Sequence, residues 1–106
     1  MYGIDLITVC IAGKNQCAID ALNYLIKINK NFNIVSLVNK SDKGKDGWQK
    51  SFKKYSKKRK IKIVKIHELY NLKKLYLFSF EYENLLKVNK FKSKNLFNFH
   101  FSLLPK

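Results

Sequence analysis

The sequence predicts an α/β fold built on an open, doubly wound and mostly parallel sheet. Short runs of branched apolar residues alternate along the chain with amphipathic stretches, which is the pattern of repeated β-α-β units. The first apolar run, residues 5–12, is almost entirely apolar, as expected for a central strand that is covered on both faces. The length of 106 residues leaves room for one domain.

Two strands and two helices are expected in the first half of the chain. Gly13 permits a sharp turn after the first strand, and Asn15 is the expected N-cap of a helix whose apolar residues recur at helical spacing up to Ile26. A second strand is expected over residues 33–38, followed by a loop over residues 39–47. The next helix is expected to carry three aromatic residues on one face: Trp48, Phe52 and Tyr55.

Three further strands are expected in the second half. They cover residues 61–64, 75–78 and 96–101, and a short helix is expected over residues 81–86. In an open parallel sheet, ligands bind outside the carboxyl ends of the strands, near the point where the strand order reverses. Functional residues are therefore expected directly after the strands.

The net charge of +15 comes almost entirely from lysine, because Arg59 is the one arginine among 22 basic residues. Lysines spread over solvated faces account for this charge, and a polyanion-binding surface accounts for it as well. A dedicated nucleic-acid reader would use more arginine, whose planar fork fits phosphates and guanine edges. We therefore expect no specific nucleic-acid partner, and we interpret the basic run at residues 57–60 as a solvated turn.

The two cysteines, Cys10 and Cys17, have a spacing that matches no metal motif. We expect both to be reduced thiols in the core of a cytoplasmic protein that binds no metal. The apolar run at residues 4–12 is too short to span a bilayer and does not resemble a signal peptide, so no membrane partner is expected.

A dinucleotide-binding fingerprint is missing after the first strand. The turn contains Gly13 where the Gly-x-Gly-x-x-Gly pattern needs three glycines, which disfavours NAD. Lys14 and the helix N-terminus that follows it could still attract an anion, and an ordinary strand-to-helix turn is the alternative.

The strongest functional signal lies in the last eleven residues. Alternation along a strand sends Asn98, His100 and Ser102 to one side and three phenylalanines to the other: Phe97, Phe99 and Phe101. Two polar groups suited to catalysis are thus expected side by side at the carboxyl end of a strand.

The segment from Asn98 to Pro105 resembles the Asn-x-His-x-Ser-Leu-Leu-Pro signature of formyltransferases that use 10-formyltetrahydrofolate. That family includes methionyl-tRNA formyltransferase, glycinamide ribonucleotide formyltransferase and the sugar formyltransferases. Residues 12–22 are similar to the start of the enzyme that formylates UDP-4-amino-4-deoxy-arabinose. Residues 42–52 resemble the loop and helix of formyltransferases that act on nucleotide-linked amino-deoxysugars. The similarity covers essentially the whole chain and implies a Rossmann-like formyltransferase N-terminal domain.

The resemblance implies a role for each matching residue. His100 takes the place of the catalytic imidazole that moves a proton from the attacking amine, and Asn98 takes the place of the amide that donates to the oxygen of the tetrahedral intermediate. Gly13 and Lys14 are expected at the substrate. Ser102, Leu103, Leu104 and Pro105 are expected to shape the loop beneath the sugar and formyl group. The folate pterin is expected against four residues after the fourth strand: Phe80, Tyr82, Glu83 and Asn84.

The resemblance also implies that parts of the family pattern lie beyond Lys106, among them an aspartate that orients the imidazole. We therefore expect residues 1–106 to be a partial N-terminal catalytic domain, truncated after the signature and inactive alone. The strand at residues 96–101 would then be exposed along an edge, which favours self-association or pairing with a missing C-terminal half.

The function expected from the resemblance is transfer of a formyl group from 10-formyltetrahydrofolate to the amine of a nucleotide-linked amino-deoxysugar, in lipopolysaccharide or O-antigen biosynthesis. Two alternatives stay open. One is a fragment similar to methionyl-tRNA formyltransferase, which would suit the basic charge. The other is a basic α/β binding module without catalysis, in which Asn98 and His100 are structural.

Overall fold

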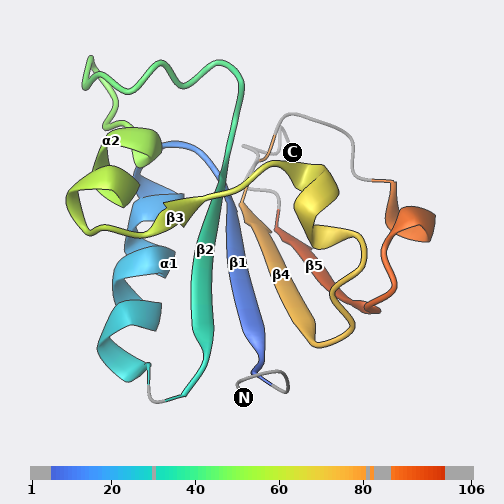
Figure 1. Ribbon diagram of the computed structural model, residues 1–106. Helices are drawn as coiled ribbons and strands as arrows, with labels where there is room; N and C mark the ends of the chain where they lie inside the picture. Colours follow the sequence, from blue (N-terminus) through green and yellow to red (C-terminus); the bar gives the residue numbers. More distant parts are fainter. Residues whose placement is uncertain (1–5, 30, 81, 83–86, 100–106) are drawn as a thin grey trace, which may run out of the picture.

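The computed structural model describes residues 6–29, 31–80, 82 and 87–99. Within these residues five parallel strands form one sheet, in the order β3-β2-β1-β4-β5 (Figure 1). The elements along the chain are β1 (Thr8–Gly13), α1 (Asn15–Ile28), β2 (Asn33–Val38), α2 (Phe52–Lys58), β3 (Lys62–Ile63), the 3-10 helix η1 (Ile66–Leu69), β4 (Leu75–Phe80), the 3-10 helix η2 (Val88–Lys90) and β5 (Asn95–Phe99). The predicted doubly wound α/β fold is confirmed.

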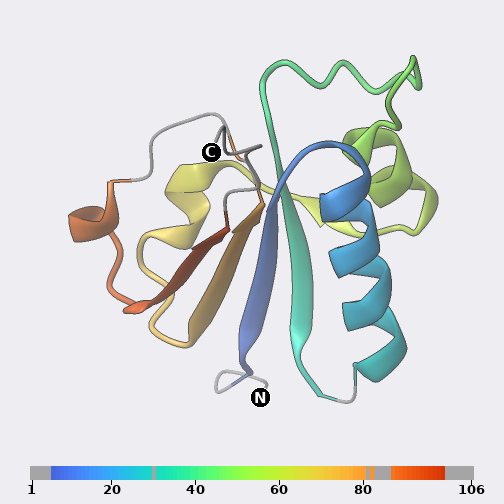
Figure 2. The ribbon, with the colours of Figure 1, turned by 180° about the vertical axis from the view of Figure 1, so that it is seen from behind.

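The two faces of the sheet are covered by different kinds of element. Helices α1 and α2 cover one face and the 3-10 helix η1 covers the other (Figures 1 and 2). Each face has its own apolar core. Phe52 and residues of α1 such as Leu22 pack on Ile11 of β1, whereas Leu69 of η1 packs with Cys10 and Leu77 on the opposite face. The near-continuous apolar character of β1 follows from its burial on both faces.

The strand order reverses between β1 and β4. The chain moves outward from β1 through β2 to β3, and it then returns to β4, which pairs with β1 on the other side. The carboxyl ends of these parallel strands meet at one edge of the sheet, where ligands bind in doubly wound folds. This arrangement brings Gly13 at the end of β1 beside Phe80 at the end of β4.

Helix α2 is shorter than the sequence predicted. It begins at Phe52, and Trp48 lies outside it with 93% of its surface exposed. Ser51 caps the helix by accepting from the backbone N–H of Lys54, and this cap fixes the start of the helix. The predicted aromatic stripe is therefore reduced to Phe52 and Tyr55.

Two further predictions on α1 are wrong. The N-cap is Lys14 rather than Asn15, because Asn15 is already the first residue of the helix, with a left-handed φ of 65°. Cys17 is exposed rather than part of the core, whereas Cys10 is buried as predicted. The buried face of α1 begins one residue later, at Ala18.

Candidate functional site

The carboxyl ends of three strands are level with one another. In the strand register Gly13 of β1 is opposite Phe80 of β4, and Phe80 is opposite Phe99 of β5. Of the predicted site residues, Gly13, Phe80 and Asn98 therefore lie along one edge of the sheet.

Gly13 lies very close to the backbone of Phe80 on the neighbouring strand. Its φ of 153° is one that residues with a side chain rarely adopt, and a Cβ atom there would overlap the carbonyl oxygen of Phe80. The same Cβ would also be 3.3 Å from the Cβ of Ala18. A glycine is thus required at the junction of β1 and α1, beside the point where the order of the strands reverses.

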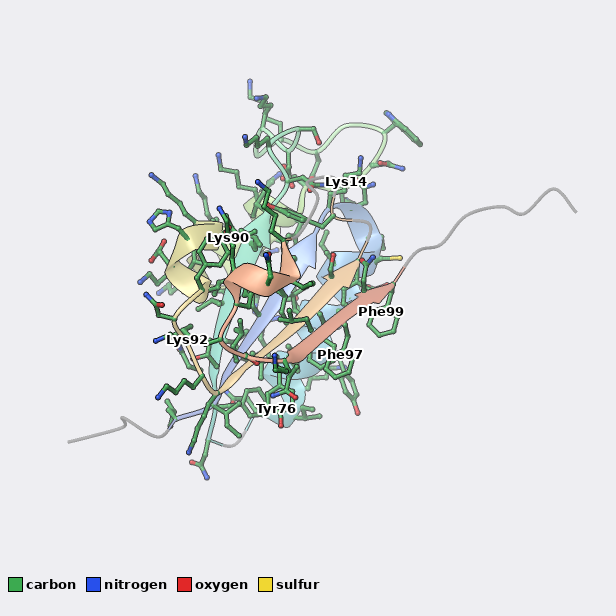
Figure 3. The ribbon with its side chains drawn as sticks, turned by 90° about the vertical axis from the view of Figure 1, so that its right-hand side faces the viewer. Lys14, Tyr76, Lys90, Lys92, Phe97 and Phe99 are labelled. Carbon is green, nitrogen blue, oxygen red and sulfur yellow. The ribbon has the colours of Figure 1, made fainter. Side chains whose placement is uncertain are left out.

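The predicted alternation along the fifth strand is confirmed where it is described. Phe97 and Phe99 lie on one face of β5 (Figure 3). They stack on Phe78 and Phe80 of β4, with ring centroids 5.1 Å apart in each pair. Asn98 lies on the opposite face, in register with Ser79, and is exposed. The remaining residues predicted here lie outside the described residues: His100, Ser102, Leu103, Leu104 and Pro105.

The expected folate-binding residues lie in part at the end of β4. Phe80 is half-buried and stacks on Phe99, while Tyr82 is half-buried and packs against the core on the η1 face. Both aromatics therefore have a packing role that is independent of any ligand. Glu83 and Asn84 lie outside the described residues.

A hollow of about 300 Å³ opens where Lys14 follows β1. Its wall combines the start of α1 with the segment between β2 and α2, and four of its residues are lysines: Lys14, Lys43, Lys45 and Lys50. Ser51 is shared with a second hollow of about 270 Å³, which Lys54 and Lys58 also line. Two adjoining basic hollows thus flank the start of α2.

Two aspartates hold the segment that carries these lysines. Asp42 accepts hydrogen bonds from the Ser51 hydroxyl (2.6 Å) and from the backbone N–H groups of Gly44 (3.0 Å) and Lys53 (2.9 Å). Asp46 accepts from the Ser51 backbone N–H (2.9 Å) and from the Lys54 ammonium (3.1 Å). The segment is therefore tied to the start of α2 by its own carboxylates.

The pKa of Asp42 reflects this bonding. Partial burial by itself would raise the pKa, but the hydrogen bonds from Ser51 and from the backbone N–H groups of Lys53, Gly44 and Phe52 outweigh it and lower the pKa below its usual value. The pKa of Asp46 is lowered as well, first by the Ser51 N–H and then by Lys54. Both carboxylates therefore remain charged at neutral pH.

Three further findings concern residues outside the sheet edge. The basic run at residues 57–60 is a turn only in its second half, because Lys57 and Lys58 are the last residues of α2. Arg59, which follows the helix, donates to Asn23 and to the Tyr55 hydroxyl. The part of the chain that the structure describes contains no group of three histidine, cysteine or acidic residues that could hold a metal ion. Among the same residues, no helix has both the length and the apolar character needed to cross a membrane.

Solved structures of N-formyltransferases match this chain. WlaRD, a sugar 3N-formyltransferase crystallised in the presence of dTDP and 5-N-formyl-THF, is 45% identical, with a TM-score of 0.85 over 95% of this chain. An N-formyltransferase from Helicobacter canadensis, in complex with folinic acid and dTDP-3-aminofucose, is 44% identical, with the same TM-score and coverage. No protein-family model and no curated protein matches the chain.

The matches extend over nearly all of this chain but over little of the relatives. The chain spans 37% of the length of WlaRD and 38% of that of the Helicobacter canadensis protein. The predicted resemblance to the sugar N-formyltransferases is confirmed, and so is the predicted fold of their N-terminal domain.

The sequence pattern alone predicts no binding role for the lysines at residues 43–50. The available signal was the resemblance of residues 42–52 to a loop and helix of formyltransferases that act on nucleotide-linked sugars. Lysines in a polar loop are normally solvated, so this resemblance alone does not indicate a binding role. The lysines become candidates for binding because the fold brings them next to Lys14.

Proposed function

We propose that this relative of the sugar N-formyltransferases is part of the catalytic domain of an enzyme that formylates a nucleotide-linked amino-deoxysugar, with 10-formyltetrahydrofolate as the formyl donor. The observation that carries the proposal is the identity of 44–45% over 95% of the chain to two sugar N-formyltransferases. The TM-score of 0.85 for each supports the same fold throughout the matched region.

The sheet edge suits this reaction. The sugar amine would attack the formyl carbon and form the new C–N bond, and the bond from that carbon to folate N10 would break. The amine would lose one proton, and N10 of the leaving tetrahydrofolate would gain one. We assign the proton transfer to His100 and the hydrogen bond to the developing oxyanion to Asn98. The role assigned to Asn98 is supported by its exposed position on β5, near the carboxyl end of the strand.

The donor and acceptor would lie on the two sides of the strand reversal. Phe80 and Tyr82 at the end of β4 provide apolar surface for a pterin, in line with the folate compounds in the related structures. Lys14 at the end of β1 provides positive charge for the phosphates of a nucleotide sugar. We place the reaction in the cytoplasm, where thiols such as Cys10 and Cys17 stay reduced, and in the synthesis of bacterial surface polysaccharide.

The proposal is tested by exchange of the matching segment in WlaRD for this chain. The chimera is incubated with 10-formyltetrahydrofolate and a dTDP-linked 3-amino sugar, and the formylated product is measured by mass spectrometry. We expect product, with unexchanged WlaRD as the positive control. Circular dichroism and a thermal melt establish that the chimera folds. A folded chimera that neither binds folinic acid nor forms product contradicts the proposal.

A further inference from the structure

We propose that the half of the sheet that α1 and α2 leave uncovered docks a helix with an apolar side, and that this helix belongs to the part of the related formyltransferases that lies outside their match to this chain. The docking surface, which we call the aromatic face, consists of Tyr76, Phe78, Phe80, Phe97 and Phe99. The inference goes beyond the proposed function, because it concerns the polypeptide that packs on the sheet and not the substrates. It rests on the proposed function only in the source that it assigns to the helix.

The aromatic face is apolar and uncharged. Its three residues in β4 alternate with buried ones and therefore point to the α1 side of the sheet. Phe97 and Phe99 of β5 stack on Phe78 and Phe80, and they are still 43% and 40% exposed. Neither strand contains a charged residue, although the whole chain has a net charge of +15. A contiguous exposed surface of this kind marks an interaction site.

Helix α1 borders the aromatic face with an apolar flank. Its flank toward α2 is polar, and Asn23 on that flank accepts hydrogen bonds from α2 and the residue after it. The opposite flank carries Cys17, Ala21 and Tyr24, of which Cys17 and Tyr24 are exposed. Buried residues of α1 pack in one cluster with the partly buried rings of β4, so this flank and the aromatic face adjoin. A helix that lies beside α1 would contact both surfaces at once.

The described parts of the connections between strands lie elsewhere, and the handedness of the fold explains why. Connections between parallel strands are right-handed. The chain passes from β1 to β3 in one direction along the sheet, with α1 and α2 on one face, and it passes from β3 to β5 in the other direction. Its later connections therefore belong on the opposite face, where η1 lies (Figures 1 and 2) and where Leu69 and Phe91 share one core. A helix on the aromatic face must come from other polypeptide.

The related structures indicate the source of such a helix. The match covers 37% of WlaRD and 38% of the Helicobacter canadensis protein, so most of each relative lies outside it. The TM-score of 0.85 means that the sheet is shared, and the unmatched part is the polypeptide available to pack on it. A helix suits the face, because sheets bury their apolar faces against helices, as this sheet does against α1. A second copy of this chain is the weaker occupant, since each copy brings a net charge of +15.

Thiol accessibility tests the docking directly. Phe97→Cys places a thiol within the aromatic face, and mass spectrometry measures its rate of alkylation by iodoacetamide in two proteins. One is the 106-residue chain, at a concentration at which light scattering shows a monomer, and the other is the WlaRD chimera, which contains the rest of WlaRD. We expect alkylation to be at least about tenfold slower in the chimera, because a covered thiol reacts only after local opening. The native Cys17 should be slowed as well.

Lys57→Cys is the matched control. Lys57 is exposed on α2, which packs on the polar flank of α1, away from the aromatic face. Its alkylation is expected to be equally fast in the chain and in the chimera. A thermal melt establishes that each protein is folded. Alkylation of Phe97→Cys that is as fast in the folded chimera as in the chain alone would overturn the docking surface.

A stability measurement gives an independent readout. Phe97→Ser with Phe99→Ser is compared with Leu72→Ser and Val88→Ser, a pair of exposed apolar residues before β4 and in η2. In the chain alone, the two double variants should shift the urea midpoint by similar amounts, because all four side chains are partly exposed. In the chimera the phenylalanine pair should shift it further, since docking buries those rings. Equal shifts of the two pairs in the chimera would contradict the proposal.

Failure of this inference differs from failure of the proposed function. If the chimera transfers formyl while Phe97→Cys reacts as fast in it as in the chain alone, the docking surface is overturned and the formyltransferase assignment stands. If the thiol is protected while the folded chimera neither binds folinic acid nor transfers formyl, the proposed function fails and the docking surface stands.

Discussion

Gly13 and Phe80 lie so close across the strand reversal that any side chain on Gly13 would meet the carbonyl oxygen of Phe80. The contact involves backbone on both sides, so no rotamer change can relieve it. The junction of β1 and β4 is therefore fixed at the level of their carboxyl ends.

The Gly13→Ala variant tests this junction. We expect it to lower the free energy of unfolding by about 1–3 kcal/mol, because the alanine is strained at a φ of 153° and clashes with Phe80. Gly47→Ala is the matched control, since a Cβ there would meet nothing within 4 Å, and a change within about 0.5 kcal/mol is expected. Urea denaturation measures both. Equal stability of the two variants would contradict the close approach.

Asp42 is expected to anchor the segment between β2 and α2. Asp42→Asn removes the charge that accepts from Ser51 and Lys53, and it is expected to cost about 1 kcal/mol, as the loss of a helix cap does. Asp20→Asn, at an exposed residue bonded only to Gln16 in the described contacts, is expected to change stability by less than about 0.5 kcal/mol. Urea denaturation at pH 7 compares them.

The same substitution has a pH signature. The pKa of Asp42 is lower in the folded chain than its ordinary value of 3.8, so protonation favours unfolding. The contribution of the Asp42 carboxylate to the free energy of unfolding is complete at a pH above its ordinary pKa. This contribution is lost as the pH falls through the lower pKa that Asp42 has in the folded chain. The stability difference between the original chain and Asp42→Asn should therefore narrow as the pH is lowered below 3.8. A difference that stays constant down to pH 2 would exclude the carboxylate as the anchor.

Asn98 and His100 are expected to carry the formyl transfer. In the WlaRD chimera, Asn98→Ala should lower kcat by about 100- to 1,000-fold, the usual effect of the loss of one oxyanion donor. His100→Ala should reduce turnover at least as far, because proton transfer contributes about 100-fold or more. Both variants should keep the circular dichroism spectrum of the parent. Unchanged turnover in either would remove that residue from the catalytic assignment.

The face of β5 that carries Phe97 and Phe99 is expected to promote self-association. The two side chains are 43% and 40% exposed, and β5 is an edge strand of the described sheet. Replacement of both by serine should lower the apparent mass in concentration-dependent light scattering. Ile28→Ser, at a residue that is 43% exposed at the end of α1, should leave the mass unchanged. A chain that is monomeric at all concentrations would contradict the expectation.

Local pattern was sufficient to locate the strands, although β3 is shorter than expected and β4 continues to Phe80, two residues past its expected end. The bounds of β2 agree with those expected, because an apolar run between polar residues defines a buried parallel strand. The opposed faces of Phe97 and Asn98 likewise follow from alternation alone. Of the predicted catalytic pair, Asn98 is placed at the expected edge of the sheet, whereas His100 lies outside the described residues.

Features that depend on distant contacts could not be predicted in this way. The start of α2 is set by Asp42, which binds Ser51 nine residues further along, so Trp48 was wrongly assigned to the helix. The exposure of Cys17 depends on how α1 is rotated against the sheet. The basic hollow arises only when the pairing of β1 with β2 brings Lys14 close to Lys43.

The contrast between the two cysteines gives the chain a built-in reporter of its folded state. Cys10 is fully buried and burial raises its pKa far above the usual range, so it is both inaccessible and protonated, whereas Cys17 is exposed on the first turn of α1. A thiol reagent should therefore titrate one group in the native chain and two after unfolding. A fluorophore attached at Cys17 would also lie four residues from Gly13, so it would report on the carboxyl end of β1 without labelling the core.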